Sequence, residues 1–423
     1  MILIKNGRVI DPLSNLDEKL DILIDGENVV EISKIVEETR ADRIIDASKS
    51  IVSPGFVDVH SHFRDPGYTY KEDIFTGAEA AAKGGYTTVI CMANTNPVVD
   101  NEGTLKYILD RAKKAKIEVL QVAAITKGLC GNEIVDMDYL KKCGAVGFSD
   151  DGKPIKNSRV AEDAMFMAKE LDVPLSFHEE DPDLICENGI NSGKTAKKLG
   201  IKGSPGEAES VLVARDAVLA IKTMAKVNIQ HISSALSVEL VRHAKKLGAN
   251  ITCEATPQHF SITEDEILKK GSNAKLNPPL RTKDDREAII KGLADGTIDI
   301  IATDHAPHSE KEKQGEIVKT PSGMIGLETA LSLAVSNLVK PGCLSYMEIL
   351  KKLTLNPARL YNLDRGYIKE GHRADIVIFN PEEEYVVGSF ASKSSNSPFT
   401  GEKLYGRIKN TIYRGEVVYE DKR

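Results

Sequence analysis

Two histidines one residue apart, His60 and His62, end an apolar run that begins near Phe56. Side chains alternate between the two faces of a strand, so both imidazoles of such a pair can reach one metal ion. An isolated pair of this kind is more often a strand end without a metal. Here the pair precedes an Arg64-Asp-Pro-Gly67 turn, and further histidines and aspartates recur along the chain. We therefore interpret His60 and His62 as candidate metal ligands.

The other candidates are histidines and aspartates at the ends of later apolar runs: Asp150 and Asp151, His178, His231 and Asp304. Imidazole and carboxylate groups suit zinc, and two ions would need a shared bridging anion. Two such ions would activate one water molecule near neutral pH. A carboxylate beside that water can accept its proton and pass it to a leaving nitrogen. The residue types therefore indicate metal-assisted hydrolysis.

The elements that would position these residues follow a strand-then-helix rhythm. We expect strands at Phe56–His62, Thr87–Ala93, Glu118–Ile125, Ala145–Ser149, Pro174–His178, Val227–Ser233, Asn250–Ala255 and Ile298–Thr303, with helical patterns after them at Lys71–Lys83, Leu105–Lys116, Ala161–Leu171, Glu207–Lys226, Ser237–Leu247, Asp284–Ala294 and Leu327–Leu338. Eight such units over about 290 residues favour an α/β fold of the (β/α)8 TIM-barrel type. Catalytic groups of that fold lie at the C-terminal ends of strands, where the candidates are found.

Both ends of the chain have a different sequence pattern, in which short β-type runs are separated by turns. Asn6-Gly7 and Asp25-Gly26 between apolar runs are typical of hairpins, and Arg414-Gly415 predicts a turn near the C-terminus. We therefore predict a small β-sandwich domain built from residues 1–53 and 366–423, flanking a metal-dependent barrel over residues 54–365.

Composition excludes several classes of function. The chain of 423 residues has a net charge of −7 and lacks the excess of basic residues typical of nucleic-acid-binding proteins. No apolar run reaches transmembrane length. No Gly-rich nucleotide fingerprint follows a strand. The six cysteines are scattered along the sequence, which predicts reduced thiols. The first residues lack the basic region and apolar core of a signal peptide. We expect a cytoplasmic protein.

Two stretches resemble the signatures of a known family: Asp58-Val-His-Ser-His-Phe-Arg-Asp-Pro-Gly67 and Ala302-Thr-Asp-His-Ala-Pro-His308, with Lys313 five residues on. The likeness continues through Ala93-Asn94-Thr-Asn-Pro97, Gly147-Phe-Ser-Asp-Asp-Gly152, Phe177-His178-Glu-Glu180, His231-Ile-Ser-Ser234, Lys275-Leu-Asn-Pro-Pro-Leu-Arg281 and Pro321-Ser-Gly-Met-Ile-Gly-Leu-Glu328. This ordered series resembles the dihydroorotases of the amidohydrolase superfamily and covers essentially the whole chain.

The resemblance implies two zinc ions per subunit. His60, His62 and Asp304 would bind one ion, and His178 and His231 the other. Asp151 would bridge them in the place where many amidohydrolases have a carboxylated lysine. Because Asp150 and Asp151 are neighbours, the sequence does not decide which of them bridges the ions. The position within the motif favours Asp151. Asp304 would also be the catalytic acid and base.

The resemblance further implies a substrate site and an activity. Arg64, Asn94 and His308 resemble carboxylate-binding groups, beside His62, and Asn277, Ser322 and Gly323 resemble contacts to the ring amide. An arginine fork suits a carboxylate, and Arg64 shares the metal face if the strand stays extended. The implied reaction is the reversible cyclisation of N-carbamoyl-L-aspartate to (S)-dihydroorotate in pyrimidine biosynthesis. His259 is a candidate to support the ligands, and Glu179 and Glu180 are candidates to orient His178 or its loop.

Two other interpretations stay open. One is a different cyclic amidohydrolase, of the allantoinase or hydantoinase type, for which a lysine at position 151 would be expected. The other is a non-catalytic partner of aspartate transcarbamoylase, for which loss of ligands would be expected. A homodimer and an association with that enzyme are further expectations from the resemblance. The charged stretch 309–320 suggests a mobile lid.

Overall fold

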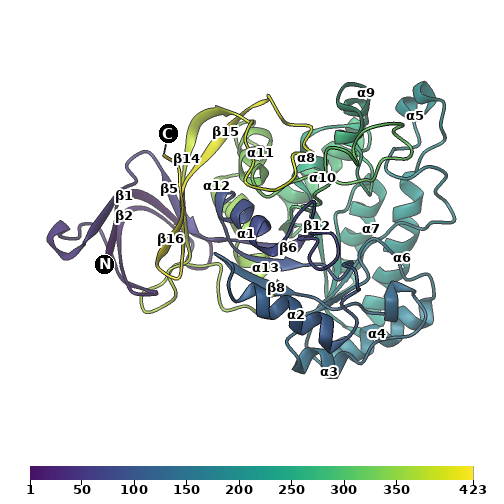
Figure 1. Cartoon of the computed structure of the whole chain (residues 1–423), viewed down its shortest axis with the longest axis horizontal. Helices are drawn as coiled ribbons and strands as arrows, with labels where there is room; N and C mark the ends of the chain where they lie inside the picture. Colours follow the sequence, from purple (N-terminus) through teal and green to yellow (C-terminus); the bar gives the residue numbers. More distant parts are fainter. Residues whose placement is uncertain (423) are drawn as a thin grey trace.

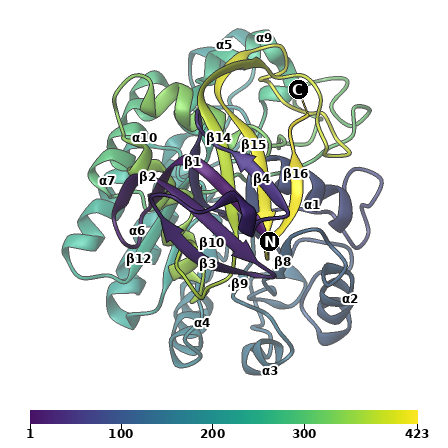
Figure 2. The same ribbon diagram turned by 90° about the vertical axis from the view of Figure 1, so that its left-hand side faces the viewer.

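The computed structural model describes residues 1–422 and has a mixed α/β architecture. A sheet built from both ends of the chain lies at one end of the molecule, and the helix-covered middle of the chain occupies the rest (Figure 1). Seen from the side of the terminal sheet, its purple and yellow strands lie in front of the helices (Figure 2).

The terminal sheet has eight strands: β1 (Ile2–Asp11), β2 (Leu16–Asp25), β3 (Asn28–Ser33), β4 (Arg43–Asp46), β5 (Ile51–Pro54), β14 (Ile376–Val386), β15 (Lys403–Tyr413) and β16 (Glu416–Glu420). Their order is β16-β15-β14-β5-β1-β2-β3, with β4 beside β1. The antiparallel pair of β5 and β14 joins the two ends of the chain. Alternating residues such as Ile4, Ile22 and Ile376 form a buried apolar cluster on this sheet.

One hairpin prediction in this sheet is wrong. Asn6-Gly7 lies inside β1, where the register with β2 shifts between Ile4 and Gly7, so it forms a bulge and no turn. Asn6 takes a left-handed backbone (φ 63°), and its amide donates to Asp21 Oδ1 at 2.8 Å. Asn-Gly supplies the left-handed conformation that either a turn or a bulge requires, and the continued pairing with β2 decides between them.

Two parallel sheets form the middle of the chain. One has the order β6 (Phe56–Ser61), β7 (Tyr86–Cys91), β8 (Glu118–Gln121), and the other the order β13 (Ile300–Ile301), β12 (Ile251–Ala255), β11 (Val227–Ile229), β10 (Leu175–Phe177), β9 (Phe148–Ser149). Parallel bridges Ala123–Phe148 and Ser61–His305 join the two sheets at both edges. Each of the eight predicted strands is present in shortened form. Because neighbours run in one direction, their carboxyl ends face the same side.

Helices cover these sheets: α1 (Ile74–Lys83), α2 (Glu102–Ala112), α3 (Met137–Lys142), α4 (Ser158–Glu170), α5 (Lys194–Leu199), α6 (Gly206–Thr223), α7 (Ala235–Lys246), α8 (Pro257–Ser261), α9 (Ile267–Lys270), α10 (Lys283–Asp295), α11 (Ala330–Ala334), α12 (Tyr346–Leu353) and α13 (Leu355–Leu360). The predicted helix Leu327–Leu338 is α11 followed by a π-helical turn, Val335–Val339. Asp73 and Thr282 begin α1 and α10 with capping boxes. Within residues 1–422, no helix combines the length and apolar character needed to cross a bilayer.

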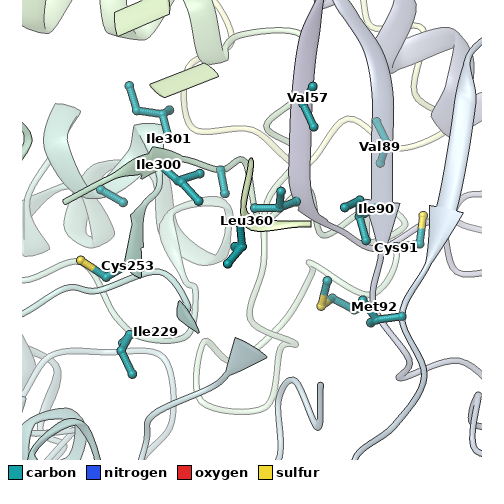
Figure 3. Close-up of a cluster of buried hydrophobic side chains, with 14 of the residues drawn as sticks. Val57, Val89, Ile90, Cys91, Met92, Ile229, Cys253, Ile300, Ile301 and Leu360 are labelled. Carbon is teal, nitrogen blue, oxygen red and sulfur yellow. The ribbon is translucent and has the colours of Figure 1, made fainter. Parts of the chain in front are cut away.

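The core lies between strands and helices. Figure 3 shows part of it, with Val57 from β6, Ile90 from β7, Ile229 from β11 and Ile300 from β13 among the labelled side chains. All four are fully buried. Burying one such side chain contributes about 1.5–3 kcal/mol, so this packing holds the strands whose ends carry the candidate ligands.

Candidate metal centre and active site

The two histidines of the first motif lie at the end of β6. His60 is within the strand, and His62 follows its last residue, Ser61. Both imidazoles are buried. His60 Nε2 lies 3.3 Å from Asp151 Oδ1, and His62 Nε2 lies 3.1 Å from Asp304 Oδ1. The strand ends of β6, β9 and β13 therefore meet at one place.

Two groups of possible ligands share one residue. The first is His60, His62 and Asp151, and the second is Asp151, His178 and His231, with the ligand atoms of each group within 4.8 Å of one another. Asp304 belongs to the same cluster, since its Oδ1 is also 3.6 Å from His60 Nε2. The six predicted ligands are thus brought together.

Asp150 and Asp151 point to different surroundings. Asp150 accepts hydrogen bonds from the amides of Ile125 (2.7 Å) and Thr126 (3.0 Å) and from the Thr126 hydroxyl. Asp151 faces the histidines, with Oδ1 3.6 Å from His178 Nδ1 and 3.7 Å from His231 Nε2. Asp150 therefore holds the loop after β8, and Asp151 is the one of the two aspartates that belongs to both groups of possible ligands.

Carboxylates behind the histidines fix which nitrogen faces the cluster. His60 Nδ1 lies 3.0 Å from Glu254 Oε2, and His178 Nε2 lies 3.1 Å from Glu180 Oε2. A carboxylate can only accept, so these nitrogens carry protons, and the opposite nitrogens are the ones that face the cluster. Of the two glutamates expected to orient His178 or its loop, Glu180 makes the contact with His178, and Glu179 Oε1 is buried without a hydrogen-bond partner among the described residues. Glu254 was not predicted, although a glutamate inside the apolar strand Ile251–Ala255 is a signal of a buried partner.

The donor set fits metal ions. Two ligand atoms each about 2.0–2.1 Å from a tetrahedral zinc are about 3.3 Å apart. The distances from Asp151 to the histidine nitrogens run from 3.3 to 3.7 Å. His60 Nε2 is fully buried and has no hydrogen-bond partner among the described residues. A cation would satisfy that atom, because burying a polar group without a partner is costly.

The charges of the cluster keep its carboxylates ionised. Burial opposes ionisation of Asp151, but the neighbouring His60, His178 and His231 hold its pKa well below the usual range. Burial also opposes ionisation of Asp304, and the contact with His62 lowers its pKa overall. Both side chains are therefore in the form that binds a metal.

Three site residues have a left-handed backbone: Arg64 (φ 59°), His231 (φ 33°) and Asp304 (φ 45°). This conformation is uncommon for residues other than glycine and costs free energy unless the surroundings impose it. For Arg64 it means that the strand does not stay extended beyond Ser61, so the predicted alternation does not place its side chain. The turn does so instead, and Arg64 Nε donates to Pro307 O at 3.3 Å.

Asn94 lies between two candidate ligands. His62 Nδ1 donates to Asn94 Oδ1 at 2.9 Å, and Asn94 Nδ2 donates to Asp151 Oδ2 at 3.0 Å. Both ends of the amide are therefore engaged with ligands. In this arrangement Asn94 orients His62 as Glu254 orients His60.

His308 is held by the residues around it. Its Nδ1 accepts from Lys71 Nζ at 3.3 Å, and its Nε2 donates to Ser322 O at 2.9 Å. Burial, aided by the charges of Arg64, Lys71 and Lys313, lowers the pKa of His308 to about 2, so the ring is neutral. Lys71 was not predicted; no spacing rule connects it to His308.

The remaining predicted contacts lie in two loops. Asn277 precedes a cis peptide bond to Pro278, and its Oδ1 is buried without a partner in the described chain. His259 Nε2 donates to Pro278 O at 3.0 Å, and the support of the ligands by His259 stays a prediction. Gly323 has φ 126°, and its carbonyl accepts from Lys313 Nζ at 2.9 Å.

The stretch 309–320 is tied to the rest of the site. Lys71 Nζ contacts Glu312 Oε1 at 3.0 Å, and Lys275 Nζ donates to Thr320 O at 2.6 Å. Lys313 Nζ donates to Pro321 O at 2.9 Å, and burial lowers the pKa of Lys313 to about 7. These contacts connect the stretch to Lys71, to Lys275 and to Pro321.

A sequence profile of the amidohydrolase family matches residues 51–418. The chain belongs to the amidohydrolase family. Among curated relatives, a dihydroorotase of Clostridium acetobutylicum is 66% identical over 100% of both chains, and one of Clostridioides difficile is 60% identical over 99% of this chain and 100% of its own. The resemblance found in the motifs is therefore confirmed.

Solved amidohydrolase structures share the fold. The L-hydantoinase (dihydropyrimidinase) of Arthrobacter aurescens superimposes with a TM-score of 0.88 at 24% identity, covering 100% of this chain and 96% of its own. The dihydropyrimidinase of Brevibacillus agri gives 0.86 at 23% identity, covering 100% and 95%. At these identities the likeness concerns the fold alone.

Proposed function

We propose that the chain is a zinc-dependent dihydroorotase that interconverts N-carbamoyl-L-aspartate and (S)-dihydroorotate in pyrimidine biosynthesis. Dihydroorotases at 51–66% identity over 99–100% of this chain support the activity. The structural observation that carries the proposal is the pair of ligand groups sharing Asp151, with Arg64 on the adjoining turn. An aspartate at 151 also sets the chain apart from the lysine expected in an allantoinase or hydantoinase.

The ligand roles follow from the two groups. His60, His62 and Asp304 would hold one zinc ion, His178 and His231 the other, and Asp151 both. When bound, the ions supply polarisation of the amide carbonyl and activation of water. Glu254, Glu180 and Asn94 contact the histidine nitrogens that face away from the cluster, and they would hold the rings in place when the ions bind.

Asp304 moves the proton in this proposal. Its carboxylate lies among the ligands and is ionised, so an oxygen is available to accept a proton from the attacking water. Asp304 then gives that proton to the departing ring nitrogen, which completes ring opening. In the direction of cyclisation, Asp304 takes the proton from the ureido nitrogen.

Arg64 and the loops around it bind and orient the substrate. Arg64 offers a planar guanidinium for the carboxylate of dihydroorotate. Asn94 lines the same cavity as Arg64, and the neutral His308 is assigned to the same carboxylate. Asn277, with its unpartnered Oδ1, and the Ser322-Gly323 backbone face the ring amide in this assignment. The stretch 309–320 would close over the bound ring as a lid.

The finer structural assignments belong to the same proposal. We infer a (β/α)8 barrel over residues 54–365, supported by the bridges at both edges of the parallel sheets, and a small β-sandwich domain from residues 1–53 and 366–423. We also propose that the enzyme works in the cytoplasm as a homodimer and can associate with aspartate transcarbamoylase.

The experiment is an absorbance assay of ring opening by the purified zinc-loaded chain, with dihydroorotate as substrate and allantoin and dihydrouracil as controls. Turnover of dihydroorotate alone is the expected result. Dihydrouracil has the same ring without the carboxylate, so its turnover at a similar rate would contradict the role of Arg64. Turnover of allantoin in place of dihydroorotate would identify another cyclic amidohydrolase.

A further inference from the structure

Asn396 lies outside the parallel sheets, in the connection between β14 and β15 (residues 387–402). This yellow segment leaves the terminal sheet and extends over the middle of the molecule towards α8 (Figure 1). Asn396 is nonetheless only 4% exposed. A polar side chain buried to this degree is expected to have specific partners.

The partners of Asn396 are backbone groups of two site loops. The first loop contains Ala306 and His308, and the second contains Gly323 and Ile325. His308 N donates to Asn396 Oδ1 at 3.0 Å. Asn396 Nδ2 donates to Ala306 O at 3.1 Å and to Gly323 O at 3.0 Å. The backbone also takes part, since Ile325 N donates to Asn396 O at 3.1 Å. One amide therefore bonds to both loops through its acceptor and both donors.

The place of this amide follows from the sequence of the first loop. The two loops pair directly as far as Ala306 N, which donates to Met324 O at 2.9 Å. The next residue, Pro307, has no N–H and cannot continue the pairing. Asn396 takes over at this point and connects Ala306 and His308 to Gly323. The connection from the terminal sheet thus replaces the missing backbone bonds.

The two loops carry proposed substrate contacts, His308 on one and Ser322 with Gly323 on the other. Their approach leaves little space, because a Cβ at Gly323 would be 2.8 Å from Ala306 Cβ. A change in their separation would move the groups on both sides of the substrate. A displacement of about 1 Å is enough to weaken binding when recognition depends on fixed polar groups.

We propose that Asn396 is a positioning residue of the substrate site, which sets the spacing between His308 and the Ser322-Gly323 turn and so the affinity for dihydroorotate. The proposal rests on the proposed function. Asn396 does not touch the ligand cluster through any of these bonds, so its effect is expected on substrate binding and not on metal binding.

The test compares Asn396→Asp with Ser395→Asp in the zinc-loaded enzyme. Aspartate at 396 keeps the acceptor for His308 N but turns a carboxylate towards two carbonyl oxygens. Ser395 is exposed, so the second variant adds the same charge one residue away without touching the loops. Asn396→Ala, which only removes the bonds, is the variant to use if the aspartate chain does not fold.

We expect KM for dihydroorotate and the dissociation constant of orotate, measured by calorimetry, to rise at least tenfold in either Asn396 variant. The zinc content should stay unchanged, kcat should change less than threefold, and Ser395→Asp should behave as wild type. An unchanged KM, or a loss of kcat or zinc without a change in KM, would overturn the assignment. If wild type does not turn over dihydroorotate, the proposed function fails and this inference fails with it.

Discussion

Glu254 provides a sharp test of how the metal centre is held. Its Oε2 accepts from His60 Nδ1 at 3.0 Å, and its Oε1 accepts from Asn228 Nδ2 at 2.6 Å, both in a fully buried setting. In Glu254→Gln, the amide oxygen can accept from only one of these two donors. The amide nitrogen then faces the other donor, so either His60 or Asn228 loses its partner.

The expected size of the effect follows from the role of such outer carboxylates. Removing one costs about 10- to 100-fold in metal affinity or activity, which is about 1.4–2.7 kcal/mol. We expect Glu254→Gln to fold and to bind zinc in the first group 10- to 100-fold more weakly. Zinc affinity is measured by competition with a chelator, and folding by circular dichroism.

A second substitution makes the reasoning refutable. In Glu254→Gln combined with Asn228→Asp, the new carboxylate at position 228 could accept from the new amide nitrogen at position 254. The amide oxygen at position 254 would then be left to accept from His60. The double variant is therefore expected to recover part of the lost affinity in a double-mutant cycle. Wild-type zinc affinity in the single variant would refute the role of Glu254, and strictly additive effects would refute the hydrogen-bond exchange.

Two further predictions concern catalysis and pH. Asp304→Asn should keep the fold and at least one metal ion. Its kcat should fall about 100-fold or more, which is the usual contribution of general acid–base catalysis. Near wild-type turnover with full metal content would show that another group moves the proton. His308 has a folded pKa of about 2, among Arg64, Lys71, Lys313 and Glu312, against an ordinary value of 6.5. Only the unfolded chain then gains a proton as the pH falls below 6.5, so His308 lowers stability towards acid, by about 1.4 kcal/mol per pH unit. Urea unfolding of His308→Gln should therefore show a shallower loss of stability below pH 6 than wild type, and parallel curves would contradict the shifted pKa.

The candidate ligands could be predicted because each lies at or just after a strand end. His60, His178 and Asp304 follow apolar runs in the sequence, and parallel strands bring such ends together whatever the details of packing. The choice between Asp150 and Asp151 could not be made this way. It depends on the loop that contains Thr126, whose hydroxyl donates a hydrogen bond to Asp150. That loop is remote from Asp150 in the sequence.

Other features depend on contacts that no local pattern records. Lys71 and His308 are 237 residues apart, and Asn396 reaches loops some 70–90 residues before it. The Asn6-Gly7 bulge was misread as a turn, because the local preference for a left-handed backbone is the same in both and β2 decides the outcome. Helices such as α8 and α13, of five and six residues, are too short for a periodic pattern.

The account as a whole depends on two metal ions acting together at the shared Asp151. The most direct measurement is a titration of metal-free protein with zinc, in which bound zinc and dihydroorotate turnover are followed on the same samples. The account predicts that turnover rises to a plateau at about two zinc ions per chain, as expected for a paired site. Full turnover in the chelated protein, or a plateau at zinc content far below two, would contradict it.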